Sequence, residues 1–383
     1  MIDRLAKSLV DARLKRSPAV GLVGPRQCGK TTLAQSIGGE YFDLESEPDR
    51  VRLDLRWDEL VAANTLVVLD EAQAWPEVFP RLRGAIDRQR KRMGRFLLLG
   101  SVSPALMKQV SESLAGRLSL VELTPLLLEE AGAGAMDRLW LRGGYPEGGP
   151  LDPEQYPRWQ RDYLALLAQR DLPNWGLSAA PTTTDRLMRM VAAVHGQEWN
   201  ASKIAQSLAV SYKTVNSYMD YLAGAFLVRR LEPFHANIKK RLVKRPKVYW
   251  RDSGLLHALM QVRDMDHLLA QPWVGASWEG FVIEQVLGHL SAWGAVVDAY
   301  HMRTSDQYEI DLLLEIEGRR WAIETKLTSS PSVEDLRRTA KAASFAKADR
   351  VVMVSRTAEE VDSEKVLSTN IEGLLCQLDQ LLG

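Results

Sequence analysis

Residues 19–37 read AVGLVGPRQCGKTTLAQSI, an apolar run followed by a glycine-bounded loop and a helix-like segment. Residues 24–31 fit the complete pattern G-x-x-x-x-G-K-[ST], in the strand–loop–helix context that this pattern requires. The glycines let backbone N–H groups close around phosphate oxygens, and the N-terminus of the following helix favours negative charge. Lys30 is predicted to reach the β- and γ-phosphates, and the Thr31 hydroxyl to bind Mg²⁺. The predicted nucleotide-binding residues in this loop are Gly24, Gly29, Lys30, Thr31 and Thr32.

Two further apolar runs end in residues that suit a nucleotide site. Residues 64–71 read NTLVVLDE, a buried strand that ends in two acids. Asp70 is predicted to hold Mg²⁺ together with Thr31, and Glu71 to polarise the attacking water. Residues 96–101 read FLLLGS, and Ser101 at its end is predicted to sense the γ-phosphate. With the second strand present, a chance glycine loop is disfavoured, and ATP and Mg²⁺ are the expected cofactors.

Arg117 lies in the segment SESLAGRLSLVELTPL and allows two interpretations. It is a candidate arginine finger or sensor, which as a finger would stabilise transition-state charge on the nucleotide of a neighbouring subunit. It is equally well explained as a surface arginine at the end of a helix. The sequence leaves both interpretations open.

Residues 200–222, NASKIAQSLAVSYKTVNSYMDYL, predict a helix-turn-helix. Ser202 is predicted to cap the first helix and Ser211 the second. The apolar positions of the second helix follow the spacing of a buried stripe, which leaves Lys213 and Thr214 free to contact DNA. The alternative is a winged helix that contacts proteins.

The segment 229–251 that follows is strongly basic in a chain whose net charge is zero. It contains nine basic residues and one acid, Glu232, which predicts a positive strip for phosphate contacts. The alternative is a solvated basic face without a nucleic-acid partner. The predicted DNA-binding residues are Lys213, Thr214, Lys239, Lys240, Arg241 and Lys244.

Residues 308–326, YEIDLLLEIEGRRWAIETK, predict a β-hairpin that turns at Glu317-Gly318. In this register, positions that sum to 635 lie opposite each other, which pairs Asp311 with Glu324 on one face, with Lys326 two residues along. Opposed carboxylates repel unless a cation lies between them, and Mg²⁺ or Mn²⁺ is the natural occupant. Alternatives are an exposed hairpin with ionic decoration, in which Glu309 pairs with Lys326, or a fold that binds without cutting.

The pattern D-x₁₂-E-x-K resembles the PD-(D/E)XK nuclease superfamily, with Ile in place of Pro before Asp311. That resemblance implies catalytic roles for Asp311, Glu324 and Lys326. It also implies a helical carboxylate upstream, for which Glu279 is the first candidate and Glu284 the second. The metal ligands that this resemblance implies are Glu279, Asp311 and Glu324.

Seven segments together resemble a prokaryotic family of AAA-superfamily ATPases with a carboxy-terminal PD-(D/E)XK-type domain. The segments are GPRQCGKTTL, LVVLDEAQ, LLLGSVSPALMKQVSESLAGRL, GGYPE, YWRDSGLLHAL, WEGFV and EIDLLLE…IETKL. The resemblance implies a polar sensor around Ser101 and Ser103 and a shared arginine at Arg117. It also implies a homo-oligomer such as a hexameric ring.

Composition limits the remaining choices. The 383 residues are enough for two or three domains, and no apolar run approaches the ~18 residues of a membrane span. The amino terminus lacks an apolar signal core, and two cysteines exclude a disulfide framework, so a cytoplasmic location is expected. The expected fold class is α/β. Its expected parts are a P-loop AAA-type ATPase core (1–135), a helical lid (136–198), a winged helix-turn-helix (199–260) and a nuclease-like α/β domain (270–383).

The function expected from these features is ATP-driven processing of duplex or branched DNA. Remodelling or translocation would be coupled to metal-dependent cleavage or to clamping of the DNA. The alternative is a nucleotide-dependent oligomeric switch or scaffold whose nuclease-like domain binds DNA or protein without cutting. A transcription regulator is a weaker alternative, because the helix-turn-helix lies between two larger segments.

Overall fold

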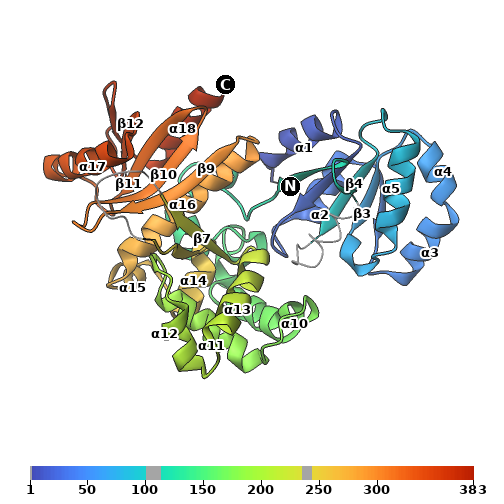
Figure 1. The fold of residues 1–383 in the computed structure, drawn as a ribbon, viewed down its shortest axis with the longest axis horizontal. Helices are drawn as coiled ribbons and strands as arrows, with labels where there is room; N and C mark the ends of the chain where they lie inside the picture. Colours follow the sequence, from blue (N-terminus) through green and yellow to red (C-terminus); the bar gives the residue numbers. More distant parts are fainter. Residues whose placement is uncertain (1, 101–113, 235–243) are drawn as a thin grey trace.

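The computed structural model describes residues 2–100, 114–234 and 244–383 (Figure 1). The first part of the chain builds a five-stranded, all-parallel sheet in the order β2-β3-β4-β1-β5. Its strands are continuous apolar runs because both faces are covered, by α1 and α2 on one side and by α3, α4 and α5 on the other. The elements are α1 (Ala6–Leu14), β1 (Ala19–Val23), α2 (Lys30–Ile37), β2 (Glu40–Asp43), α3 (Glu47–Leu55), α4 (Trp57–Ala62), β3 (Val67–Asp70), η1 (Ala72–Ala74), α5 (Val78–Arg88), β4 (Phe96–Gly100) and β5 (Leu118–Glu122).

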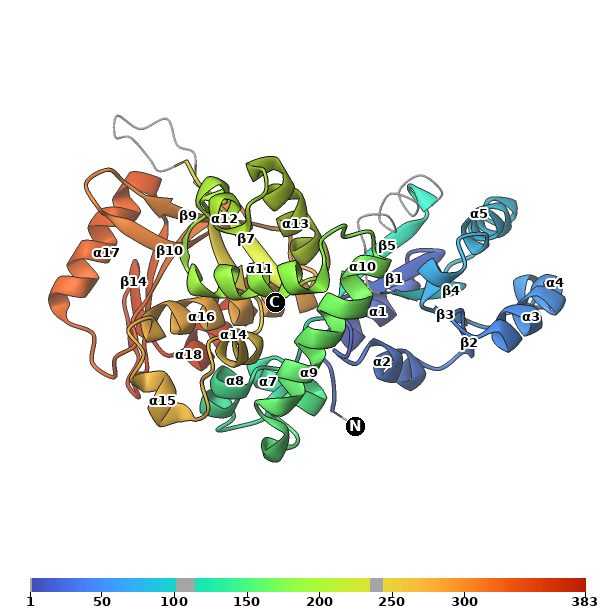
Figure 2. The same cartoon turned by 90° about the horizontal axis from the view of Figure 1, so that it is seen from below.

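The middle of the chain is mainly helical and packs around a core of its own. Figure 2 shows α9 and α10 between the first sheet and the rest of the molecule, with α11 beside α12. The elements are α7 (Leu128–Ala131), α8 (Met136–Arg142), η2 (Pro146–Gly148), η3 (Pro153–Gln155), α9 (Arg158–Leu166), the π-helical turn η4 (Leu167–Asp171), α10 (Leu172–Asn174), α11 (Pro181–Ala193), β6 (Gln197–Glu198), α12 (Ala201–Leu208), α13 (Tyr212–Gly224), β7 (Val228–Pro233) and β8 (Lys247–Trp250).

Helices α12 and α13 follow one another with a short turn between them, where the sequence predicts two helices. The Ser211 side chain accepts a hydrogen bond from the Thr214 N–H, as its predicted capping role requires. The predicted cap at Ser202 is wrong. The first helix already begins at Ala201, and the Asn200 side chain caps it by accepting from the Lys203 N–H.

The last part of the chain contributes to a nine-stranded sheet in the order β13-β14-β12-β11-β10-β9-β7-β8-β6. Pairing of Leu312 with Ile323 confirms the predicted hairpin register. Glu317 and Gly318 both have positive φ, as a two-residue turn of this kind requires. The elements are α14 (Ser253–Leu259), α15 (Met265–Leu269), α16 (Val274–Ala292), β9 (Val297–Arg303), β10 (Glu309–Ile316), β11 (Arg319–Thr325), α17 (Val333–Ala346), β12 (Arg350–Val354), β13 (Val361–Asp362), β14 (Val366–Thr369) and α18 (Ile371–Leu382).

The nine-stranded sheet crosses the boundary expected between residues 260 and 270. Strand β7, which follows the helix-turn-helix, pairs in parallel with β9 through Glu232–Tyr300 and Pro233–His301. Strand β8 pairs with β7, and β6 pairs with β8. The division into four parts stays a prediction, but the helix-turn-helix and the carboxy-terminal strands share one hydrogen-bonded sheet.

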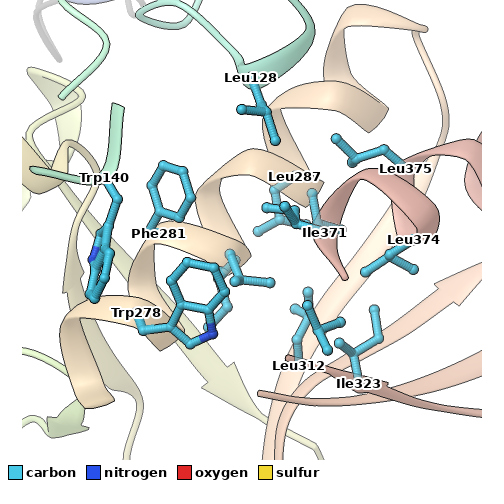
Figure 3. Close-up of a cluster of buried hydrophobic side chains, with 14 of the residues drawn as sticks. Leu128, Trp140, Trp278, Phe281, Leu287, Leu312, Ile323, Ile371, Leu374 and Leu375 are labelled. Carbon is cyan, nitrogen blue, oxygen red and sulfur yellow. The ribbon is translucent and has the colours of Figure 1, made fainter. Parts of the chain in front are cut away.

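Helix α16 connects the core of this sheet to the chain that leaves the first sheet (Figure 3). Leu128 of α7 and Trp140 of α8 pack with Trp278 and Phe281 of α16, and Leu312 of β10 belongs to the same cluster. The Trp140 and Trp278 rings meet edge to face with their centroids 5.2 Å apart. The expected lid is therefore divided, because α8 joins this core while α9 to α11 join the helical one.

His289 of α16 forms a buried ionic contact between distant segments. Its Nδ1 lies 2.6 Å from a Glu129 oxygen and its Nε2 lies 2.9 Å from an Asp379 oxygen, while its side chain is 1% exposed. Burial lowers the pKa of His289, but the hydrogen bond to Glu129 and the charges of Glu129 and Asp379 outweigh burial and raise it above 6.5. The fold therefore favours the charged imidazolium.

We expect His289 to make stability depend on pH. Because its pKa is raised in the folded protein, its contribution is complete below about pH 6.5 and is lost as the pH rises through the folded-state value. Thermal unfolding of the wild type and of His289→Gln between pH 5.5 and 9 measures this contribution. The difference in Tm should shrink towards high pH, and a difference that is constant over this range would contradict the ionic role.

Among the helices that the structure describes, none combines the length and the apolar character needed to cross a bilayer.

Candidate functional site

The loop between β1 and α2 has the backbone shape that phosphate binding needs. Gly24 and Gly29 have positive φ, and a Cβ on Gly24 would lie 2.1 Å from the Leu123 carbonyl oxygen. The Lys30 ammonium lies in the loop and donates to the carbonyl oxygens of Gly24 and Pro25 at 3.0 and 2.7 Å. A phosphate in the loop would take over these donors, because the ammonium gains more from an anion than from neutral carbonyls.

The two acids at the end of β3 lie next to this loop, as predicted. The Thr31 hydroxyl donates to Asp70 Oδ2 at 2.6 Å, and the Tyr41 hydroxyl donates to the same oxygen at 2.8 Å. Glu71 follows in the left-handed conformation and lines the same cavity as Lys30. Burial raises the pKa of Glu71, although Lys30 and other neighbours oppose this. A half-buried carboxylate of raised pKa suits a general base.

These residues fit a Mg²⁺–nucleotide complex. A hydroxyl and a carboxylate oxygen in direct contact are the donor set that Mg²⁺ takes from protein when phosphate oxygens and water complete its shell. Thr31 and Asp70 would hold the ion, and Lys30 would bind the phosphates. A bound Mg²⁺ would neutralise charge on the β- and γ-phosphates.

The cavity beside the loop has a volume of about 480 Å³, the size of an ordinary small-molecule site. The predicted residues that line it are Gly29, Lys30, Thr31, Thr32 and Glu71, whereas Gly24 and Asp70 are not lining residues. The amino-terminal segment and the segment after α8 complete it. Outside residues 24–37 and Glu71, the lining residues are Ile2, Asp3, Arg4, Lys7, Leu126, Pro146, Glu147 and Leu151.

Arg26 connects the phosphate-binding loop to the helical segment. Its guanidinium donates to Asp171 Oδ1 at 2.6 Å, and the Tyr163 hydroxyl donates to the Arg26 carbonyl oxygen at 3.2 Å. Asp171 belongs to η4 and its side chain is buried. Sequence reasoning missed this contact because Arg26 occupies a free position of the loop pattern and Asp171 belongs to no motif.

Arg117 lies directly before β5, at the amino-terminal end of this strand. The phosphate-binding loop follows the carboxyl end of the neighbouring parallel strand β1. Its guanidinium makes a two-pronged ion pair with Asp87 of α5, with both N···O distances at 2.9 Å. This position and the ion pair argue against a sensor role towards a nucleotide bound in its own chain. The two remaining interpretations are a finger directed at a neighbouring subunit and a surface ion pair. The predicted sensor residues Ser101 and Ser103 lie outside the described residues.

The basic segment carries less free charge than its sequence indicates. Of its six basic residues that the structure describes, four pair with acids from other segments: Arg229 and Arg251 with Glu284, Arg230 with Asp220, and Lys247 with Glu279. Lys239, Lys240 and Arg241 lie outside the described residues. Lys213 at the start of α13 and Lys244 before β8 are exposed. Thr214 is half-buried, and its hydroxyl is hydrogen-bonded to that of Ser211.

The hairpin brings Asp311, Glu324 and Lys326 together on one face, as predicted. Asp311 Oδ2 accepts from both the N–H and the hydroxyl of Thr325 at 2.9 Å, and Lys326 donates to Glu324 Oε1 at 2.8 Å. A register shift between Ile310 and Leu313 marks a bulge at Asp311, a feature that re-aims a side chain. Burial is the first cause that raises the pKa of both Asp311 and Glu324.

The carboxylates of this face do not converge on a metal position. The predicted partner Glu279 accepts from Lys247 at 2.8 Å and from the Tyr249 hydroxyl instead. Glu309 pairs with Lys247 rather than with Lys326. The second candidate, Glu284, is held by Arg229 and Arg251. Across residues 2–100, 114–234 and 244–383, no group of three or more His, Cys, Asp or Glu side chains is arranged to hold a metal ion.

The parallel sheet, the phosphate-binding loop, and Thr31 in contact with Asp70 define a P-loop ATPase. A family model described as "AAA domain" matches residues 16–132. Two models described as domains of unknown function match the remainder, DUF8612 over residues 134–266 and DUF4143 over residues 274–372.

Two curated proteins are similar over most of the chain. They are the uncharacterized proteins Rv2008c of Mycobacterium tuberculosis (strain ATCC 25618 / H37Rv) and Mb2031c of Mycobacterium bovis (strain ATCC BAA-935 / AF2122/97). Each is 42% identical over 332 residues, which are 85% of this chain and 74% of the relative. The chain belongs to the family of these two proteins, a family of P-loop ATPases with an AAA domain.

Among solved structures, the Walker-type ATPase PABY2304 of Pyrococcus abyssi is similar with a TM-score of 0.46 and 15% identity, over 68% of this chain and 96% of that one. AMPPCP-bound DnaA from Aquifex aeolicus is similar with a TM-score of 0.26 and 14% identity, over 57% of this chain and 87% of that one.

Proposed function

We propose that this P-loop ATPase is a DNA-processing protein whose nucleotide state changes the grip of its helix-turn-helix on duplex or branched DNA. The ATPase provides the energy and α12, α13 and the basic segment provide the contact. The proposal favours clamping or remodelling of DNA over cleavage, because the expected metal ligands Glu279 and Asp311 do not converge on a metal position.

One observation carries this proposal, an ion-pair path from the nucleotide site to the helix-turn-helix. Glu122 ends β5 and pairs with Val23, the residue directly before the phosphate-binding loop. Arg251, which follows β8, donates to Glu122 and to Glu284 of α16, with a distance of 2.9 Å to the latter. Glu284 also binds Arg229 of β7. A shift of the loop upon hydrolysis would therefore act on the strands next to α13.

DNA contact is supported by α13 and by the exposed lysines around it. A helix that begins at a capping serine, with Lys213 and Thr214 in its first turn, presents its N-terminal residues as recognition helices do. Lys244 adds an exposed charge three residues before the wing strand β8. The arginines of the segment that pair with acids stabilise the fold, so few side chains of the described part remain available to bind phosphate groups of DNA.

Charge reversal tests this surface. We expect Lys213→Glu together with Lys244→Glu to weaken binding of duplex DNA by about tenfold or more, and to lower the slope of log affinity against log salt by about 2, because two phosphate contacts are lost. Fluorescence anisotropy at several salt concentrations, with ATP and with ADP, gives both quantities. Lys365→Glu, an exposed lysine of the carboxy-terminal part, is the matched control.

If the charge-reversal variant keeps the DNA affinity and the salt slope of the wild type, α13 and the wing do not contact DNA. Equal affinity in the ATP and ADP states of the wild type would remove the nucleotide control and leave simple DNA binding. If the wild type cuts DNA in the presence of Mg²⁺ or Mn²⁺ and the Lys326→Ala variant does not, the protein is instead a nuclease.

A homo-oligomer such as a ring belongs to the same proposal. In it, Arg117 would leave Asp87 and approach the nucleotide of a neighbouring subunit. The position of Arg117 at the sheet edge far from its own nucleotide supports this role. The alternative is a nucleotide-dependent scaffold that binds a protein through the same surfaces.

A further inference from the structure

Lys247 lies at the centre of a cluster of carboxylates in the carboxy-terminal part. Its ammonium is 2.8 Å from Glu279, 2.6 Å from Glu309 and 3.8 Å from Asp311. Its side chain is only 5% exposed, so water screens these contacts little. An ammonium has three N–H donors and no acceptor; Glu279 and Glu309 lie within hydrogen-bond distance of it, and Asp311 attracts it from farther away.

Strand pairing brings this lysine to the cluster from a different part of the chain. Lys247 is the first residue of β8, and it pairs with Leu231 of β7. Strand β7 joins β9, and β9 joins β10, which carries Glu309 and Asp311. Glu279 approaches from α16. The lysine is therefore placed by the sheet that links the helix-turn-helix segment to the carboxy-terminal strands.

The ammonium and a divalent ion would compete for the same carboxylates. Mg²⁺ and Mn²⁺ need oxygen ligands that converge from several directions at short distance. Here one oxygen of Glu279 binds Lys247 and Tyr249, and one oxygen of Asp311 is held by Thr325. A divalent ion at this place would also lie next to a buried positive charge, and like charges repel strongly there.

We propose that the ammonium of Lys247 is the resident cation of this cluster, so that Glu279, Glu309 and Asp311 fasten strand β8 to the carboxy-terminal sheet instead of holding a divalent metal ion. The residues that resemble a nuclease site thus form a buried ion-pair cluster that stabilises the sheet. This inference concerns a second site and goes beyond the proposed function, because neither ATP turnover nor DNA binding is needed for it.

The test measures Mn²⁺ binding by the full chain without nucleotide, using electron paramagnetic resonance to separate free from bound ion. The wild type and the control Lys365→Gln should bind no Mn²⁺ at this cluster. Lys247→Gln should gain one Mn²⁺ per chain, with an affinity at least about tenfold above that of the wild type, because the competing charge is gone. Adding Asp311→Asn to Lys247→Gln should abolish this gain.

Two results would overturn the inference: wild-type Mn²⁺ binding that Asp311→Asn removes, or a folded Lys247→Gln protein that gains no site. If Lys247→Gln does not fold, the comparison of Mn²⁺ binding by the wild type and by Asp311→Asn still tests the inference. The double variant Lys247→Gln with Glu279→Gln removes one charge of each sign and so keeps the net charge of the cluster unchanged. DNA affinity and ATP turnover, measured on the same samples, report on the proposed function separately.

Discussion

Replacing Lys30 by alanine is expected to lower ATP turnover by about 10²–10³-fold or more, the cost of removing one preorganised donor to the reacting group. Lys30 is 6% exposed and its ammonium lies inside the loop, so no neighbouring lysine can take its place without rearrangement. Release of inorganic phosphate at saturating ATP and Mg²⁺ measures the effect.

Two variants make this result specific. Glu71→Gln should also stop turnover but keep ATP binding, because it removes only the candidate base. Lys365→Ala, an exposed lysine far along the chain, should leave turnover unchanged. If Lys30→Ala hydrolyses ATP at the wild-type rate, the loop after β1 is not the catalytic nucleotide site.

Replacing Arg251 by methionine is expected to lower the free energy of unfolding by about 1.5–3 kcal/mol, because the buried Glu284 keeps Arg229 but loses one of its two charged hydrogen-bond donors. The Arg251 side chain is 10% exposed and that of Glu284 is 9% exposed, so water cannot replace the lost contact. Glu122 at the end of β5 loses its partner as well. Urea denaturation followed by circular dichroism gives the change.

The matched control is Arg245→Met, an exposed arginine of the same segment, which should change the free energy of unfolding by less than about 0.5 kcal/mol. Combining Arg251→Met with Glu284→Gln should cost less than the sum of the two single losses, because both variants break the same contact. A loss below about 1 kcal/mol in the single variant would show that the path from Glu122 to Arg229 carries little energy.

The nucleotide site could be predicted because its determinants are local. Gly24, Lys30 and Thr31 lie within eight consecutive positions, and a buried strand that ends in Asp70 and Glu71 places its acids at the same edge of a parallel sheet. The hairpin register was predictable for the same reason, since a two-residue turn at Glu317-Gly318 fixes every pair on both strands.

The roles of the basic residues could not be predicted, because their partners lie far away in the sequence. Segment 229–251 contains one acid of its own, yet Asp220, Glu279 and Glu284 approach it after folding. The same holds for Arg26 and Asp171, which are separated by 145 positions. Local composition gives the charge of a segment but not the charge that remains after tertiary pairing.

The Ser202 cap shows a smaller limit of sequence reasoning. Both Asn200 and Ser202 are good capping residues, and their order along the chain does not say which one starts the helix. The backbone of Trp199 is hydrogen-bonded to Pro246, and its side chain donates to Asn216. These contacts hold Asn200 at the point where the helix begins.

The sheet that joins β7 to β9 also bears on how such chains can be rearranged during evolution. The regions matched by the two domain models, 134–266 and 274–372, each contain only part of this sheet. A fragment cut between them would expose an open strand edge on both sides and separate Lys247 from three acids. The two regions should therefore be inherited, exchanged and lost as a pair.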